Sequence, residues 1–428
     1  MMKKLYLTLF LIALLNSCSD TKHTEQVTAK NDYEGYLATN TPTKDRIEQN
    51  QKFWSDRLER DSTQIVALSK LAGEYEGFFQ ATGDVKALQT SEKLLQQALA
   101  NAGRGRDGYF RSIAKNYISQ HRFKEAKTML DSAYSYPDNK KATEMMLYDV
   151  HMELGNYSKA NEFLGSIKDM SDFNYLIRLA KWSDYKGDLD SAIKYMEQAK
   201  DIAKASNRKP LMVWSYTNLA DFYGHAGRIE EAYDLYLKTL KLEPDNAYAK
   251  KSIAWIVYSY EENSEEANRI IDSVMETRRA PDYWLLKAEM AEFENAPSEA
   301  LQCQKKFIEM AMEEGYGDMY NTYLIEYLAA TDPVQALSLA REEVSHRATP
   351  ETYQLLALAQ LENGNKEAAL SIIQKHVEGK TYEPTALFTS ARVYKANGMK
   401  EKVTPLKEEL LGARFEVGPV VSKKIRDL

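Results

Sequence analysis

The sequence predicts an all-α protein, a superhelical solenoid of about nine to ten stacked helical hairpins. The stretch 216–246 reads as two amphipathic helices, with a break at Gly227 between them and Pro244 after the second. An alanine suited to close packing in the second helix returns about every 34 residues along most of the chain. Because one such hairpin cannot bury its apolar face alone, the recurrence indicates a continuous stack.

The composition agrees with this class of fold. Of the 428 residues, 44% are hydrophobic, 28% are charged and only 11 are proline, which is typical of a folded helical protein. The formal net charge is −7, and no basic stretch has interleaved aromatic residues. This balance argues against a nucleic-acid partner.

Residues 1–17 have the pattern of a secretory signal. Lys3 and Lys4 precede an apolar run over 5–15 that is too short to span a bilayer. The run ends in Leu-Asn-Ser-Cys, with Cys18 directly after a small residue. This resembles the lipobox of bacterial lipoproteins, in which cleavage leaves a lipid-bearing cysteine at the N-terminus. The alternative is an ordinary signal peptide followed by a stray cysteine.

The resemblance implies that Cys18 carries acyl chains such as palmitate, and more than one chain makes a membrane anchor stable. Ser19 follows Cys18, where an Asp would resemble an inner-membrane retention signal. We therefore expect an outer-membrane lipoprotein, on either the periplasmic or the surface face. Residues 18–45 are polar and without periodicity, which predicts a flexible tether.

Residues 46–106 are predicted to form one or more divergent helical hairpins. Gly83 and Asp84 break the apolar pattern there. Terminal repeats commonly diverge because no neighbour covers one of their sides.

The regular array is predicted over residues 107–411. The packing alanines are Ala126, Ala160, Ala192, Ala232, Ala267, Ala300, Ala336 and Ala369. Five residues before several of them stands a glycine able to adopt the left-handed conformation of a helix end, at Gly155, Gly187, Gly227 and Gly364.

The unit at 216–246 resembles the tetratricopeptide repeat, whose pattern combines aromatic, Leu-Gly, Tyr, Ala and Pro positions over 34 residues. The matching residues are Tyr216, Leu219, Ala220, Tyr223, Ala232, Tyr236 and Pro244. The tail at 412–428 loses the period, and Val417-Gly418-Pro419 does not favour a helix. We predict a strand-like or irregular cap over the last hairpin.

No catalytic, metal-binding or cofactor motif occurs in the sequence. None of the six histidines has a partner at metal-ligand spacing, and no nucleophile elbow, phosphate loop or dinucleotide fingerprint is present. His121 and His225 are expected to cap helix ends, and Cys303 to be a buried small side chain. The acidic pairs at 261–262 and 265–266 are expected on exposed faces. The sequence predicts neither an enzyme nor a metal site.

The resemblance implies that the first helices line a concave face that contacts extended peptides. By register, the residues offered to a partner are Lys181, Tyr185, Trp214, Asp221, His225 and Tyr260. The aromatic ones could equally pack between repeats. Family members that hold a C-terminal carboxylate use Lys and Asn on successive first helices, and the corresponding positions here contain no Asn.

These patterns favour a lipid-anchored scaffold that binds an envelope protein or peptide and requires no cofactor. The alternative is an outer-membrane lipoprotein that captures a glycan or another small nutrient. Such proteins place a few of these repeats beside a large irregular ligand-binding portion, for which this sequence leaves almost no room.

Overall fold

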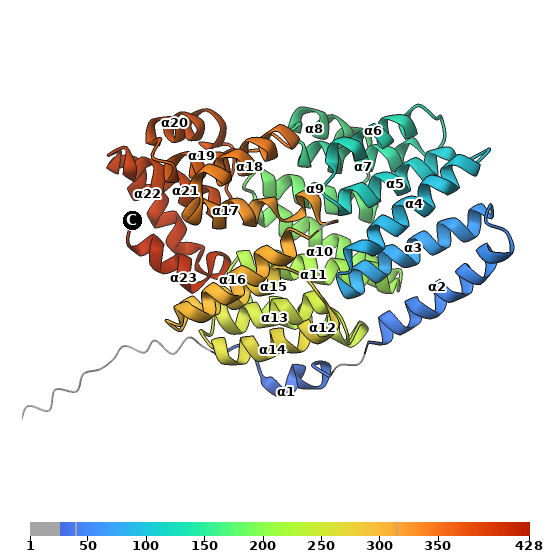
Figure 1. The fold of residues 1–428 in the computed structure, drawn as a ribbon, viewed down its shortest axis with the longest axis horizontal. Helices are drawn as coiled ribbons and strands as arrows, with labels where there is room; N and C mark the ends of the chain where they lie inside the picture. The colour runs from blue at the N-terminus through green and yellow to red at the C-terminus, as the bar shows by residue number, and fades with distance from the viewer. Residues whose placement is uncertain (1–25, 39–40, 314) are drawn as a thin grey trace, which may run out of the picture.

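The structure, a computed structural model, describes residues 26–38, 41–313 and 315–428, and within these ranges it is all-α. Cys18 and the signal segment lie outside the described residues. Ten helical hairpins follow one another in a superhelix (Figure 1). The sequence-based prediction of an all-α solenoid is therefore confirmed.

The hairpins pair helices that are adjacent in the chain. They are α3 (Ile65–Thr82) with α4 (Val85–Asn101), α5 (Arg106–Ser119) with α6 (Phe123–Tyr134), α7 (Lys140–Glu153) with α8 (Tyr157–Ser166), α9 (Phe173–Tyr185) with α10 (Leu189–Ala205), α11 (Lys209–His225) with α12 (Ile229–Leu242), α13 (Ala247–Ser259) with α14 (Ser264–Thr277), α15 (Asp282–Phe293) with α16 (Pro297–Ala311), α17 (Asn321–Thr331) with α18 (Pro333–His346), α19 (Pro350–Glu362) with α20 (Lys366–Ile372), and α21 (Pro384–Ala396) with α22 (Lys400–Gly412). A 3₁₀ turn, η2 (Gly317–Tyr320), precedes α17, and a π turn, η3 (Ile373–Val377), continues α20.

The packing alanines lie where the second helix of each hairpin meets its neighbours. Seven of the eight have no exposed surface, and Ala300 keeps 7%. Cys303 is also buried, with 5% of its surface exposed, as expected. An alanine at this position lets two helices approach closely, which explains its period.

The turn inside the hairpins needs a left-handed residue, as predicted. Gly155, Gly187, Gly227 and Gly364 have φ between 72° and 82°. The same position in three other hairpins is filled by His121, Glu262 and Asn295, with φ of 57–58°. His121 thus provides the left-handed turn residue, and no hydrogen bond from its ring to a helix end is found. The expectation that it caps a helix through its side chain is wrong.

Successive turns of the superhelix touch each other. The backbone N–H of Arg279, between α14 and α15, donates to the carbonyl of Thr82 at the end of α3, at 2.8 Å. A methyl group built on Gly155 would lie 2.5 Å from the carbonyl oxygen of Ala348, and one on Gly187 would lie 2.7 Å from the Tyr382 ring. The hairpin turns at Gly83, Gly155 and Gly187 therefore each meet a loop that comes five to six hairpins later. The concave side is closed by the chain itself.

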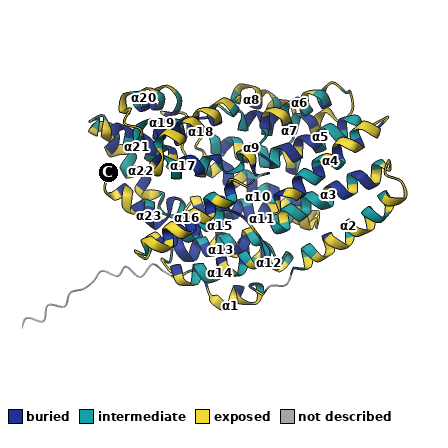
Figure 2. Ribbon diagram, viewed as in Figure 1, coloured by how far each residue is buried: buried dark blue, intermediate teal, exposed yellow. Residues whose placement is uncertain are grey.

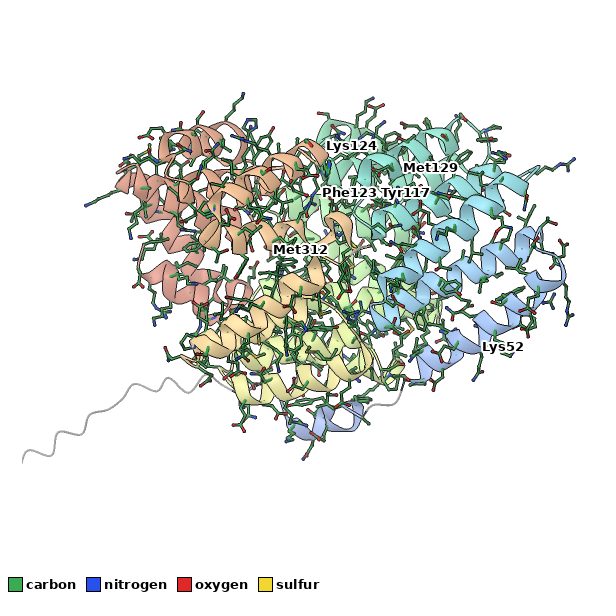
Figure 3. The ribbon with its side chains drawn as sticks, viewed as in Figure 1. Lys52, Tyr117, Phe123, Lys124, Met129 and Met312 are labelled. Carbon is green, nitrogen blue, oxygen red and sulfur yellow. The ribbon has the colours of Figure 1, made fainter. Side chains whose placement is uncertain are left out.

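The second hairpin shows the same contact through side chains. Phe123, labelled in Figure 3, lies at the start of α6, and the Arg347 guanidinium from the loop after α18 lies 5.8 Å from the centre of its ring. Such a cation–π contact adds to the seam between the turns.

Residues 26–38, which we call the strap, are ordered and docked. They include α1 (Lys30–Tyr33) and a 3₁₀ turn, η1 (Glu34–Tyr36), which lie beside α14 in Figure 1. The Tyr33 side chain keeps 2% of its surface exposed, and its hydroxyl donates to Glu266 at 2.8 Å. The prediction of a flexible tether over 18–45 is wrong for these residues. The apolar contacts of Tyr33 and Leu37 with the core fix the strap.

Helix α2 (Pro42–Arg60) follows the strap and packs along α3. Ile47 is its buried residue, and Figure 2 shows most of the helix exposed. At its start, the backbone N–H and hydroxyl of Thr43 both donate to Asp245 at 2.8 Å. This segment therefore links the first hairpin to the loop between α12 and α13.

The tail is helical, so the prediction of a strand-like or irregular cap is wrong. Helix α23 (Arg414–Arg426) has helical backbone on both sides of a break at Gly418, where φ is 75° and ψ is 169°. It contacts α11, α13 and α15 as well as α21 and α22. The tail thus fastens the last hairpin to the middle of the array.

Across the described residues, none of the helices combines the length and the apolarity needed to cross a membrane.

Candidate functional site

A cavity of about 390 Å³, which we call the inner cleft, lies at the seam between the two turns of the superhelix. One wall comes from α7, α8, α9 and α11 of the first turn, and the other comes from residues 347–351, 381–384 and α23 of the second. The charged, histidine and tyrosine side chains that line the inner cleft are Glu153, Tyr157, Lys181, Asp184, Tyr185, His225, Arg347, Glu351, Tyr382, Glu383 and Glu416.

Two cations in the inner cleft share one carboxylate. The Lys181 ammonium lies 2.8 Å from Glu153 Oε1, and the Arg347 guanidinium lies 3.5 Å from Glu153 Oε2. Arg347 also donates to the buried Glu343 at 2.6 Å. Burial alone would raise the pKa of Glu153, but Lys181 and Arg347 outweigh it and the pKa is lowered. Both cations are therefore already neutralised within the protein.

Four further carboxylates of the inner cleft have no such partner. No ion pair or side-chain hydrogen bond among the described residues reaches Asp184, Glu351, Glu383 or Glu416. Glu383 is exposed at the surface of the inner cleft, and its partial removal from water there raises its pKa to about 7, with repulsion from Asp184 and Glu351 adding to it. Burial likewise raises the pKa of Glu416 to about 7, helped by Glu383 and Asp184. Glu383 and Glu416 are thus repelled by neighbouring carboxylates, while Lys181 attracts Asp184.

Tyrosines form the remaining side of the inner cleft. Tyr157 and Tyr185 stack with their ring centres 4.3 Å apart, and Tyr382 is 57% exposed beside them. The same three tyrosines border a second cavity of about 350 Å³, which continues past His376 and Lys380. The two cavities share these tyrosines, but carboxylates line only the inner cleft, whereas Lys186 and Lys380 line the second cavity.

Three of the residues predicted to bind a partner meet in the inner cleft. These are Lys181 and Tyr185 of α9 and His225 at the end of α11. Burial lowers the pKa of His225, so this ring is neutral at pH 7. Its side chain forms no described hydrogen bond to a helix end, so the expected capping role is not observed for His225 either.

Trp214 lies elsewhere, in a separate cavity of about 600 Å³ between α2 and the helices α11 and α13. It is 39% exposed and makes an edge contact with Phe173, whose ring centre is 5.9 Å away. This position combines packing between repeats with an open surface.

The two remaining predicted residues are held by contacts inside the protein. Asp221 accepts hydrogen bonds from the hydroxyls of Tyr236 at 2.6 Å and Tyr248 at 2.7 Å. Tyr260 packs half-buried against the central core. Their roles as partner contacts stay predictions.

The positions of residues along the first helices do not predict the wall of the inner cleft that comes from the second turn and the tail. Arg347, Tyr382 and Glu383 belong to loops between hairpins, Glu351 lies in the first turn of α19, and Glu416 belongs to the tail. These residues reach the site only because a second turn of the superhelix comes to lie on the first.

A cluster of Asp318, Glu343 and His346 also brings ligand-type atoms within 4.8 Å of one another. His346 Nδ1 lies 2.7 Å from Asp318, while Glu343 pairs with Arg347 and accepts from Asn321 at 3.0 Å. The Arg347 cation already neutralises Glu343. The Glu343 carboxylate of this cluster is therefore engaged by groups of the protein itself.

The helices, their pairing and their turns define the protein as a helical-repeat solenoid. A tetratricopeptide-repeat family model matches residues 173–245, which span α9 to α12. This part of the chain is similar to tetratricopeptide repeats, and the other hairpins have the same helix-turn-helix form. No curated protein sequence matches the chain significantly.

The chain is also similar to several solved structures, among them those of three proteins. A tetratricopeptide repeat protein from Parabacteroides merdae is 14% identical, over 56% of this chain and 94% of its own, with a TM-score of 0.39. Yeast Tom70 is 15% identical, over 90% and 93%, with a TM-score of 0.40. The type IV pilus biogenesis factor PilW is 13% identical, over 51% and 99%, with a TM-score of 0.39.

Proposed function

We propose that the protein is a scaffold that binds a segment of another protein in the inner cleft, and that a lipid on Cys18 holds it at the bacterial outer membrane. The observation that carries the binding role is the inner cleft itself, a polar and aromatic hollow between two turns of a repeat array. Helical arrays of this kind generally offer such concave surfaces to protein partners.

A segment in the inner cleft would meet residues of both turns at once. Lys181 and Tyr185 would contact it from the first turn, and Tyr382 and Glu383 from the second. The seam is already ordered by contacts within the protein, so binding would cost little further loss of conformational freedom. Glycan capture would instead require a large irregular portion, and the described residues consist almost wholly of hairpins and short loops.

The binding role is tested by photo-crosslinking in cells. A benzoylphenylalanine replaces Tyr382, which is 57% exposed in the inner cleft, and in the control it replaces Val334, which is 70% exposed on the second helix α18. We expect a discrete crosslinked protein from position 382 and not from position 334. A partner trapped only from position 334, or none at 382, would contradict binding in the inner cleft.

The anchoring role has a separate test. Cys18→Ala should block acyl labelling and move the protein from the membrane fraction to the soluble fraction. Unchanged membrane retention would show that the anchor lies elsewhere.

A further inference from the structure

We infer that the inner cleft recognises a Lys or Arg side chain of an extended partner segment. This inference rests on the proposed function and adds the chemistry of the partner. It follows from the charge balance of the inner cleft, from its aromatic side and from the spacing of its carboxylates.

The charge balance leaves the inner cleft with excess negative charge. Its lining contains five carboxylates against two cations, and both cations are engaged by Glu153. Asp184, Glu351, Glu383 and Glu416 face the cavity with no cation of their own. Their mutual repulsion destabilises the free protein, and a cation placed among them would relieve it.

These four residues come from separate elements. Asp184 lies at the end of α9, Glu351 in the first turn of α19, Glu383 just before α21, and Glu416 on α23. The carboxylates are brought together by the closure of the superhelix and by the docking of the tail. An acidic face on a single helix would arise from local composition, whereas these four carboxylates meet only because four separate elements pack together.

The size and spacing of the site suit an organic cation better than a metal ion. Among the described residues, the one group of three or more ligand-type atoms that lie within 4.8 Å of one another is Asp318, Glu343 and His346, outside the inner cleft. The cleft carboxylates are therefore too dispersed to ligate one ion. A guanidinium has five donors and an ammonium three, so either can address several separated acceptors.

The tyrosines supply the second part of the recognition. Tyr157 and Tyr185 stack on each other, and Lys186 already lies 5.8 Å from the centre of the Tyr185 ring, so the ring offered to a partner's cation is that of the exposed Tyr382. A cation over such a ring gains a further attraction, and the aliphatic stem of Lys or Arg packs on the same surface. The adjoining cavity of about 350 Å³ gives the chain on one side of that residue a place to continue.

The test begins with selection from a random decapeptide display library on the purified full-length protein. We expect Lys or Arg to be enriched at one position of the selected peptides. In the best peptide, replacing that Arg by neutral citrulline, or that Lys by norleucine, should weaken binding about tenfold or more, as loss of charge-assisted hydrogen bonds predicts.

A matched pair of variants then locates the site. The triple variant Asp184→Asn, Glu383→Gln, Glu416→Gln removes three of the unpaired carboxylates. The control Glu299→Gln, Glu309→Gln, Glu367→Gln changes the charge equally, at exposed residues of the second helices α16 and α20. The cleft variant should lose peptide binding and melt at a higher temperature than the control at pH 8, because like-charge repulsion is relieved.

The possible outcomes separate the recognition of a basic side chain from the binding of any protein segment in the inner cleft. Selected peptides with no basic position, or equal binding by the cleft variant and the control, would overturn the inference. Peptides that bind in the inner cleft without a basic residue would leave the proposed function standing. If no peptide is enriched, both fail. A cleft variant that binds poorly but melts lower than the control would show that the carboxylates serve the fold, and would also overturn the inference.

Discussion

The strap and the tail fasten the two ends of the chain to the same middle hairpins, on opposite faces. The strap lies on α12 and α14, the second helices, while the tail lies on α11, α13 and α15, the first helices. Neighbouring residues at the turn between α13 and α14 hold both. Glu261 accepts from the backbone N–H groups of Val27 and Thr28 at 2.8 and 2.6 Å, and Glu262 pairs with Arg414.

The two attachments differ in what they contribute. The strap buries Tyr33 deeply and covers an outer face, away from the inner cleft. The tail is buried as well, at Val417, Val420 and Ile425, and the Trp255 indole N–H donates to the carbonyl of Phe415 at 2.9 Å, but the tail also carries Glu416 into the inner cleft. The comparison indicates that the strap serves stability, whereas the tail serves both stability and the binding site.

The largest expected effect is on the strap. Tyr33→Ala should weaken the docking of the strap by about 3–5 kcal/mol, as for other buried aromatic residues. Residues 26–38 should then be released from the array. Native-state hydrogen exchange of the strap amides measures this. Tyr33→Phe keeps the ring and loses one hydrogen bond to Glu266, so it should cost only about 1 kcal/mol. Equal losses in both variants would show that the hydrogen bond, and not burial, holds the strap.

A smaller but more local effect is expected in the tail. Gly418→Ala places a methyl group 2.5 Å from Glu289 Oε1 and 3.0 Å from Trp255, at a backbone conformation that L-residues rarely adopt. We expect the docking of the tail to be weakened by about 1–3 kcal/mol. Hydrogen exchange of the amides of residues 414–426 measures this change. Gly412→Ala, where nothing lies within 4 Å, is the control and should be neutral. If Gly418→Ala raised hydrogen exchange in the strap as much as in the tail, the docking of the strap would depend on the docking of the tail.

The acidic turn allows the two attachments to be separated. Glu261→Gln should weaken the strap by about 1–2 kcal/mol, because the hydrogen bonds from two backbone N–H groups then go to a neutral acceptor instead of a charged one. Glu262→Gln should weaken the tail by less than about 1 kcal/mol, since its pair with Arg414 is exposed. Each change should leave the other segment's exchange rates unaltered. A crossed effect would contradict the assignment of the two residues.

The smallest effect is a pH dependence of opposite sign at the two ends. Burial raises the pKa of Glu289, beside the tail, to about 7. The folded state therefore binds the extra proton, and tail docking should weaken as pH rises from about 5 to 8. Hydrogen bonds from Arg269 of the same helix and from Tyr33 of the strap lower the pKa of Glu266, and of these two the bond from Tyr33 forms when the strap docks. Strap docking should persist across that window and weaken only as pH falls below about 4.5.

Hydrogen exchange at both ends, corrected for the intrinsic effect of pH, measures this difference. Glu289→Gln should remove the pH dependence of the tail and leave the strap unchanged. A tail that tightens with rising pH in the unmodified protein would contradict the account.

Local packing made the array predictable from the sequence. The alanine period and the glycines at 155, 187, 227 and 364 describe contacts within a hairpin or between neighbours, and these depend on short stretches of chain. The strap was not predictable, because Tyr33 and Leu37 are isolated apolar residues whose partners lie more than 200 residues away. The Val417-Gly418-Pro419 stretch does break the helix, but helical backbone resumes on both sides.

The candidate site was predictable in part for the same reason. Lys181, Tyr185 and His225 follow from the register of first helices, which is a local property. Tyr382, Glu383 and Glu416 face them only because the superhelix completes a turn in five to six hairpins. That number is set by small rotations summed over many hairpins, and no single motif encodes it.

The closure of the superhelix is the central claim, and a distance measurement across the seam tests it directly. Spin labels on cysteines replacing Glu162 of α8 and Glu367 of α20, with the native cysteines removed, report on two hairpins of successive turns. We predict a narrow distance distribution that Tyr33→Ala leaves unchanged and that deletion of residues 414–428 broadens. A broad distribution in the intact chain, as in an open array, would contradict the closed superhelix and the inner cleft with it.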